Sequence, residues 1–242
     1  MLSQEAQQRI EKAKALQNNY QPNAEIADQL NEKILIMIVA PAVMGKSAVM
    51  KEVEKIAGDF KRVPVFTTRQ ARADDDTDMF RVHLHSETAI DQILTKIEER
   101  SVIQYMVHPT LGTFYGTELQ DYPAEYNMLP TISNVVEHLR NLPFKRTITI
   151  GLIAEPQTWV RWFNERYPEQ TEERSKRTQE AITSLSWLLE QPEDSVLWLI
   201  NHDDKLPETA AQLIRISRTP QKSTTDAREL AQACLQVART FI

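Results

Sequence analysis

Residues 34–47 read ILIMIVAPAVMGKS. The first six are all apolar and lack the alternation of a strand with one face in water, so they predict a strand buried on both faces of a parallel sheet. The last eight follow the pattern of a phosphate-binding loop between a strand and a helix, with alanine in place of the first glycine. We therefore expect an α/β fold with a phosphate loop at the end of its first core strand.

The same organisation continues along the chain. Two more apolar runs, 148–153 and 196–200, predict buried strands. Segments with helical character occupy residues 47–57, 158–167, 171–190, 207–217 and 225–242. Buried strands that alternate with helices indicate a three-layer α/β fold, which we expect to have a central parallel sheet of about five strands with helices on both faces.

Two regions interrupt this alternation. Residues 1–32 are polar and predict an N-terminal helical arm, which could cap the core, mediate dimerisation or be loosely attached. The rest, 33–242, forms the main domain. Within it, residues 69–145 carry shorter, mixed elements and predict an insertion between two core segments, 33–68 and 146–242.

Charge and hydropathy exclude several classes of protein. The chain of 242 residues has 28 Lys and Arg against 34 Asp and Glu, a net charge of −6, which argues against a nucleic-acid-binding protein. The longest apolar stretch, 34–44, is far shorter than the roughly 20 residues of a membrane span, and residues 1–14 lack the apolar block of a signal peptide. We expect a cytoplasmic monomer or homodimer that binds neither nucleic acid nor membranes.

Glycine and cysteine are scarce. The chain has 5 glycines, about 2% against a usual figure of about 7%, so a phosphate loop must be built with few of them. Val43 and Met44 are bulky where such loops are commonly small, which leaves open a loop that keeps its shape without activity. The single cysteine, Cys234, lies in an apolar helical stretch and favours a buried thiol.

The residue types in the loop fit the chemistry of ATP binding. Backbone N–H groups at a helix start face an anion, and the helix dipole favours negative charge there. Lys46 would reach the β- and γ-phosphates of ATP, and the Ser47 hydroxyl would bind Mg²⁺. Gly45 permits close approach of the backbone. The predicted ATP-binding residues of the loop are Ala42, Val43, Met44, Gly45, Lys46, Ser47 and Ala48.

Four further features follow the loop in order. Residues 65–72 read VFTTRQAR, and residues 115–117 read YGT. Arg166 and Arg177 are eleven residues apart, and the last apolar strand runs into NHDD at residues 201–204. Together with the phosphate loop, this order resembles the guanylate kinase family over most of the chain, from about residue 33 to residue 216.

The resemblance implies an acceptor site. In that family two arginines clamp the phosphate of the acceptor nucleotide, which assigns this role to Arg69 and Arg72; a fork of N–H donors suits phosphate oxygens. The hydroxyl of Tyr115 would contact the same phosphate, and Thr117 belongs to the same motif.

The resemblance also implies a lid and an adenine site. Arg166 and Arg177 would belong to a helical lid within residues 155–190 and would reach the transferring phosphoryl group. Asn201 would lie near the adenine. The implied activity is ATP- and Mg²⁺-dependent phosphorylation of GMP or a related nucleoside monophosphate, with nucleotides as the binding partners.

Positions that read guanine in the family differ here. The sequence has Val65 where the family has serine, Gln104 where it has glutamate, and no carboxylate within residues 129–134, where it has an acidic pair. We expect Gln104 to line the acceptor site but leave the base open. Two alternatives also remain open: a catalytically degenerate binding or scaffold module, and a kinase of another small phosphorylated acceptor such as a sugar phosphate.

Overall fold

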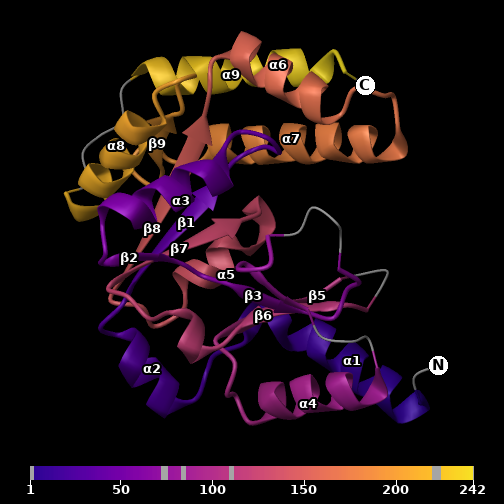
Figure 1. The fold of residues 1–242 in the computed structure, drawn as a ribbon. Coiled ribbons are helices and arrows are strands. Elements are labelled where there is room, and N and C mark those ends of the chain that lie inside the picture. Colours follow the sequence, from indigo (N-terminus) through magenta and orange to yellow (C-terminus); the bar gives the residue numbers. More distant parts are fainter. Residues whose placement is uncertain (1–2, 72–75, 83–85, 109–111, 220–224, 242) are drawn as a thin grey trace. The chain divides into compact units, whose positions relative to one another are not determined.

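A computed structural model describes residues 3–71, 76–82, 86–108, 112–219 and 225–241 (Figure 1). The chain divides into two compact units. Unit 1 comprises Met1–Ile34, Lys61–Asn127 and Glu137–Arg146, and unit 2 comprises Leu35–Phe60, Met128–Val136 and Thr147–Ile242. In the described part of the chain, no helix has the length and apolar character to cross a membrane.

The central sheet has five strands in the order β2-β7-β1-β8-β9. Their bounds are Phe60–Arg62 (β2), Tyr126–Thr131 (β7), Ile34–Val39 (β1), Arg146–Ile153 (β8) and Leu197–Ile200 (β9). β8 and β9 pair in parallel, from Ile150 opposite Leu197 to Ile153 opposite Ile200. Every residue of β1 is buried, which confirms the strand predicted from its unbroken apolar run.

Helices flank this sheet, so the α/β fold predicted from the sequence is confirmed. They are α3 (Lys46–Ile56), α6 (Pro156–Arg166), α7 (Glu172–Glu190), α8 (Leu206–Arg218) and α9 (Thr225–Arg239). Each begins within two residues of its predicted start. α3 packs against α8, and α9 packs against α6 and α7 (Figure 1). Cys234, on α9, is fully buried as expected.

Unit 1 is built on a four-stranded sheet in the order β4-β3-β6-β5. The strands are β3 (Val65–Thr67), β4 (Phe80–Val82), β5 (Gln104–Val107) and β6 (Phe114–Thr117). The remaining elements of the chain are α1 (Gln4–Leu16), η1 (Gln17–Asn19), α2 (Ala24–Leu30), α4 (Glu87–Glu98), η2 (Leu119–Asp121), η3 (Ser133–Val135) and α5 (Val136–Arg140).

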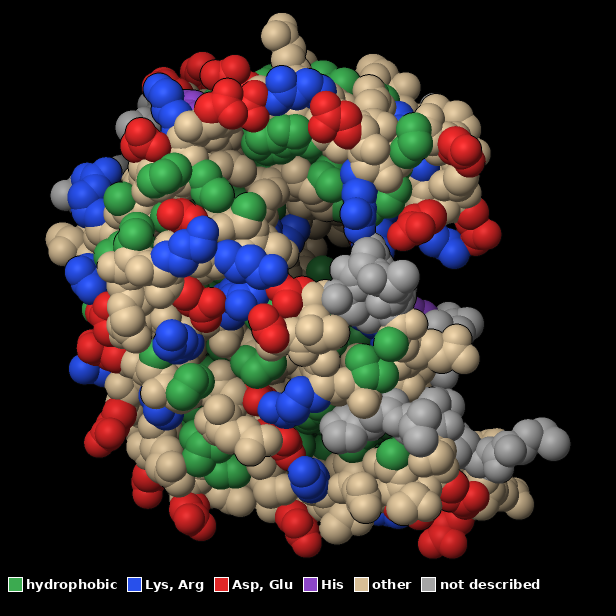
Figure 2. All heavy atoms as spheres, in the orientation of Figure 1, with side chains coloured by type: hydrophobic (Ala, Val, Ile, Leu, Met, Phe, Trp, Pro, Cys, Tyr) green, Lys and Arg blue, Asp and Glu red, His purple; other side chains and the backbone are tan. Residues whose placement is uncertain are grey.

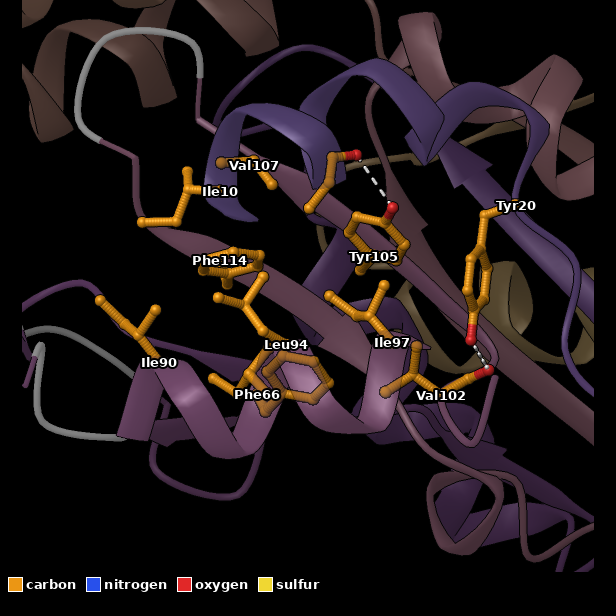
Figure 3. Close-up of a cluster of buried hydrophobic side chains, with 12 residues drawn as sticks. Ile10, Tyr20, Phe66, Ile90, Leu94, Ile97, Val102, Tyr105, Val107 and Phe114 are labelled. Atoms are coloured by element: carbon orange, nitrogen blue, oxygen red, sulfur yellow. Dashed lines mark hydrogen bonds between the residues drawn. The ribbon is translucent and has the colours of Figure 1, made fainter. Parts of the chain in front are cut away.

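The N-terminal helix α1 is part of the hydrophobic core of unit 1. Ile10 and Ala13 of α1 lie in one buried cluster with residues of α4 and of the four-stranded sheet (Figure 3). The Tyr105 hydroxyl donates to the carbonyl of Ala13 (2.9 Å), and the edge-strand N–H of Val107 donates to the side chain of Gln17 (2.8 Å). Helix α1 of the predicted arm therefore contributes side chains to the core of unit 1.

One strand of the central sheet comes from the segment predicted as an insertion. β7 lies within residues 69–145 yet pairs beside β1 in the five-stranded sheet. Its sequence, YNMLPT, contains Asn127 and Pro130 and so lacks an unbroken apolar run like that of β1. Periodicity alone therefore gave no indication of this core strand.

The surface mixes charges of both signs. On the face drawn in Figure 2, Lys and Arg side chains alternate with Asp and Glu, and hydrophobic side chains occur in small groups. Exposed pairs such as Lys176 with Glu172 (2.7 Å) are typical of the chain. Pairs of this kind contribute at most about 1 kcal/mol each, so the fold depends on its buried sheets rather than on surface charge.

Candidate functional site

The segment predicted as a phosphate loop lies between the end of β1 and the start of α3. Gly45 is the N-cap of α3 in a left-handed conformation, with φ of 89°, and no side chain caps this helix start. The first N–H groups of a helix have no acceptor within the helix, so those that follow Gly45 are available to an anion. Ser47 and Ala48, in the first turn, are exposed. The local geometry therefore fits a bound phosphate.

The loop contains a second left-handed residue, and it is not a glycine. Val43 has φ of 54°, a region that β-branched residues strongly disfavour. The next residue, Met44, is fully buried and fixes the loop to the core. Such a conformation costs about 1–3 kcal/mol and persists only where neighbouring groups hold it.

Two side chains distant in sequence hold the carbonyl groups on either side of Val43. The indole Nε1 of Trp159 donates to the carbonyl of Ala42 (3.1 Å), and Nδ2 of Asn201 donates to the carbonyl of Met44 (3.1 Å). Trp159 is on α6, and Asn201 directly follows β9. The structure thus places the side chain of Asn201, predicted near the adenine, against the phosphate loop itself.

Lys46 is folded back onto its own loop. Its Nζ donates to the carbonyls of Ala40 (2.7 Å) and Pro41 (2.8 Å). Burial disfavours the ammonium and lowers the pKa of Lys46 to about 8; the negative charge of Glu180 acts in the opposite direction, and the positive charge of Arg177 adds to the lowering.

The effect of Arg177 on the pKa of Lys46 indicates that this predicted lid arginine lies near the lysine of the loop. Arg177 is half-buried on α7 and pairs with Glu180 (2.8 Å) and Glu173 (3.5 Å). Arg166 ends α6 and is exposed. Within unit 2 the structure therefore brings Lys46 and Arg177 into one electrostatic environment.

A second arginine of α7, absent from the predicted site, is buried. Arg174 donates from Nη2 to the side chain of Asn164 (2.8 Å) and from Nη1 to the carbonyl of Tyr167. Its guanidinium lies 5.0 Å from the centre of the Phe163 ring. These contacts of Arg174 connect α7 to α6. The buried residues of α7 are Arg174, Thr178, Ala181, Ser184, Leu185 and Leu188. Arg174 therefore lies in helical register with the apolar residues of α7, and this spacing is the signal that could have identified it.

The predicted acceptor residues share one face of the four-stranded sheet. Strand register sets Gln104 opposite Thr117, and sets Tyr115 opposite both Met106 and Thr67. Residues paired across strands point to the same side of a sheet, so Gln104, Tyr115 and Thr117 face one way. The other side carries Phe66, Tyr105, Val107 and Phe114, which are buried against α1 and α4.

Arg69 lies over the same face as these polar residues. Its guanidinium is 4.8 Å from the centre of the Phe80 ring, a cation–π contact, and Phe80 pairs with Val65 on the polar side of the sheet. Its Nη1 also donates to the carbonyl of Gln70 (2.7 Å). Arg72, the second predicted clamp residue, lies outside the described residues.

The sheet face that carries these predicted residues mixes polar and apolar side chains. Two of the predicted acceptor residues are buried: Gln104 is 9% exposed, and Thr117 is fully buried with its hydroxyl bonded to that of Tyr122 (2.9 Å). Thr117 therefore has a structural role. The strand residues on this face are Val65, Thr67, Phe80, Val82, Gln104, Met106, Tyr115 and Thr117. Among these described strand positions none carries a carboxylate.

Comparisons with known proteins give only distant likenesses. No family model matches the chain, and no curated protein matches its sequence. Among solved structures, a guanylate kinase from Anaplasma phagocytophilum is similar with a TM-score of 0.46 and 14% identity, over 83% of this chain and 93% of that one. A fungal RNA kinase is similar with a TM-score of 0.30 and 13% identity, over 87% of this chain and 98% of that one. The fold assignment rests on the sheet and loop described above.

Proposed function

We propose that the chain transfers the γ-phosphoryl group of ATP to a nucleoside monophosphate. The observation that carries this proposal is the phosphate loop. It has an uncapped helix start after Gly45, and Lys46 and Arg177 lie in one electrostatic environment beside it. Phosphoryl transfer needs positioning and neutralisation of charge more than a specialised base, and this loop supplies both.

The ATP end of the site uses the loop backbone and two side chains. The N–H groups of residues 42–48 would bind the phosphates, and Lys46 would exchange its contacts with Ala40 and Pro41 for phosphate oxygens. Ser47 is exposed in the first turn of α3, and a hydroxyl oxygen is a suitable ligand for Mg²⁺. Ser47 would hold the ion, whose positive charge would offset part of the charge of the phosphates.

Arg177 and Arg166 would neutralise charge on the transferring group. Arg177 is held by Glu180 and Glu173, so an incoming polyphosphate would compete with these carboxylates for its guanidinium. Arg166, at the end of α6, would contribute from the other helix of the proposed lid. Positive groups placed where charge develops are a large source of catalysis.

The acceptor would bind on the polar face of the four-stranded sheet. Arg69 and Tyr115 would hold its phosphate together with Arg72, and Gln104 would line the base, while the buried Thr117 would act through its bond to Tyr122. Without a carboxylate on the described strands of this face, the two adjacent donors of guanine would lose their usual acceptor, at about 1–3 kcal/mol for each buried donor left unpaired. The acceptor panel below therefore includes bases other than guanine.

A binding or scaffold module is the second candidate, and one observation favours it. The Lys46 ammonium donates to two carbonyls of its own loop. In this state the loop itself provides hydrogen-bond partners for the ammonium. A protein that only binds a phosphorylated partner could retain this state together with the arginine of the polar face.

An ADP-release assay distinguishes these candidates. The full chain is incubated with Mg·ATP and, separately, with GMP, dGMP, AMP, CMP, UMP and a sugar phosphate. The kinase proposal predicts release that depends on one of the nucleotides, is abolished by Lys46→Ala, and shows a raised acceptor KM in Arg69→Ala. Turnover with the sugar phosphate alone would support a kinase of another small phosphorylated acceptor. No turnover with any acceptor would support the binding module.

A further inference from the structure

We infer that Trp159 and Asn201 are positioning residues for the phosphate loop, which they hold in its anion-binding conformation by bonding its carbonyl groups. The inference rests on the proposed function, since it concerns how the loop binds the phosphates of ATP. It assigns Asn201 a role that acts through the loop rather than through the adenine.

The loop needs outside support because of its composition. Residues 40–47 contain a single glycine, Gly45. The loop nevertheless has a second left-handed residue, Val43, with φ of 54°. A valine with a left-handed backbone conformation is strained, whereas a glycine adopts the same conformation without strain. Unless other groups compensate, the loop would relax to a conformation in which its N–H groups no longer converge.

The two bonds lie where this compensation is needed. Ala42 and Met44 flank Val43, and their carbonyls accept from Trp159 Nε1 and Asn201 Nδ2, both at 3.1 Å. In a loop whose N–H groups converge on an anion, the carbonyls must find partners elsewhere. Buried carbonyl groups without partners are costly, so these donors stabilise the arrangement that leaves the N–H groups for phosphate.

Both donors are themselves held in place. Trp159 is fully buried, and its ring packs against Phe163 (5.5 Å between ring centres) and Phe241 (6.0 Å). Asn201 is buried, and its backbone N–H donates to the carbonyl of Ile153 at the end of β8 (2.6 Å). Because neither donor can easily follow a displaced loop, each bond favours one loop conformation.

Asn201 also contacts the loop glycine. A Cβ added to Gly45 would lie 2.3 Å from Asn201 Nδ2. The asparagine therefore occupies the space that a side chain at position 45 would need, and it supports the loop on both sides of the Met44–Gly45 peptide. Trp159 has the matching position on the other side of Val43.

The test compares two ligands on the full chain by isothermal titration calorimetry: Mg·tripolyphosphate, which has no base, and Mg·ATP. The variants are Asn201→Ala, which removes the amide donor, and Trp159→Phe, which removes the indole N–H and keeps an aromatic ring. The controls are Asn141→Ala, an exposed asparagine of unit 1, and Trp162→Phe, a half-buried tryptophan of α6. Melting temperatures check that every variant is folded.

We expect each test variant to weaken both ligands by the same factor, about tenfold, and each control to bind both as the wild type does. If Asn201→Ala weakens Mg·ATP and leaves Mg·tripolyphosphate unchanged, Asn201 contacts the adenine and the inference is overturned. Unchanged binding of both ligands in both variants overturns it as well. Failure of the wild type to bind either ligand instead refutes the proposed function.

A rescue separates support of the loop from general structural damage. Val43→Gly removes the left-handed strain, so the loop should depend less on its outside donors. We expect Val43→Gly to restore Mg·tripolyphosphate binding of Asn201→Ala and of Trp159→Phe to within about threefold of the Val43→Gly single variant. Equal losses in the valine and glycine backgrounds would overturn the inference. If Trp159→Phe does not fold, the Asn201 cycle alone decides.

Discussion

The α-carbon of Gly45 lies against the side-chain amide of Asn201, so closely that a Cβ at position 45 would come within 2.3 Å of Nδ2. The two residues belong to different strand–helix junctions, since Gly45 precedes α3 and Asn201 follows β9. Their contact links the phosphate loop to the end of another strand of the same sheet. The loop is therefore defined by its own sequence and by a residue more than 150 positions away.

Gly45→Ala should abolish tight binding of Mg·ATP. The alanine would have to adopt φ of 89° and displace the Asn201 amide, and either change moves the N–H groups of the loop. We expect the Kd for Mg·ATP to rise by more than about tenfold, measured by calorimetry. Gly58→Ala is the matched control, because a Cβ there meets nothing within 4 Å. Equal Kd values for the two variants would contradict this account of the loop.

Binding of Mg·ATP should weaken above pH 8. The pKa of Lys46 is lowered to about 8 in the free protein, and bound phosphate favours the charged lysine, so binding takes up a proton above that pH. Affinity should be constant below about pH 8 and fall by up to about tenfold per pH unit above it.

The same pKa predicts how stability depends on pH. In the free protein the unfolded state binds more protons than the folded state above pH 8, so the contribution of Lys46 to the free energy of unfolding rises with pH. Binding titrations between pH 7 and pH 10, at intervals of about half a unit, measure the affinity for Mg·ATP. Unfolding titrations over the same range measure the stability of the free protein.

The charge of Glu180 sets where this transition falls. Glu180 raises the pKa of Lys46, so Glu180→Gln should shift the loss of affinity to lower pH. Glu173→Gln is the control, since Glu173 also pairs with Arg177 (3.5 Å). A transition that lies at the same pH in the wild type and both variants would show that Lys46 is not the titrating group.

Gly116→Ala should destabilise unit 1. A Cβ at Gly116 would lie 2.4 Å from the ring of Phe66 and 2.8 Å from the backbone oxygen of Gln104, and overpacking of this kind costs about 1–3 kcal/mol. Phe66→Leu in the same chain should recover part of the loss, because it withdraws the ring. The free energy of unfolding from urea titration measures both, and an unchanged value for Gly116→Ala would refute the packing of this face.

The N-terminal helix should contribute to stability through Ile10. Ile10 is 5% exposed within the cluster of α1, α4 and the four-stranded sheet, so Ile10→Ala should cost about 2–5 kcal/mol. Leu16→Ala, at a position that is 51% exposed on the same helix, should change the free energy of unfolding by no more than about 0.5 kcal/mol. Similar losses for the two would mean that α1 does not pack as the structure shows.

The core of unit 2 was predictable because its signals are local. An unbroken apolar run is sufficient to identify β1, and the GKS sequence that follows it is sufficient to place the loop and the start of α3. The mainly apolar segments 148–153 and 196–200 likewise predict β8 and β9 within two residues of their observed bounds. β7 was not distinguishable, because Asn127 and Pro130 break its pattern.

What could not be predicted depends on contacts across long sequence separations. Nothing local to Trp159 indicates that its indole bonds the carbonyl of Ala42, 117 residues away. The polar residues of α1 gave only a weak apolar face, although Ile10 and Ala13 complete the core of unit 1. Arg174 was not predicted, although it lies in helical register with the apolar residues of α7. The proposed roles of all the predicted site residues, Arg72 and Arg166 among them, stay predictions.

Phosphorus NMR of the full chain with Mg·ATP and the nucleoside monophosphates of the acceptor panel tests the central proposal most directly. The account predicts that the γ-phosphate signal of ATP declines while the signals of a new nucleoside diphosphate appear in equal amount, and that Lys46→Ala prevents both changes. A stable ATP spectrum with every nucleotide, or the appearance of inorganic phosphate alone, would contradict it.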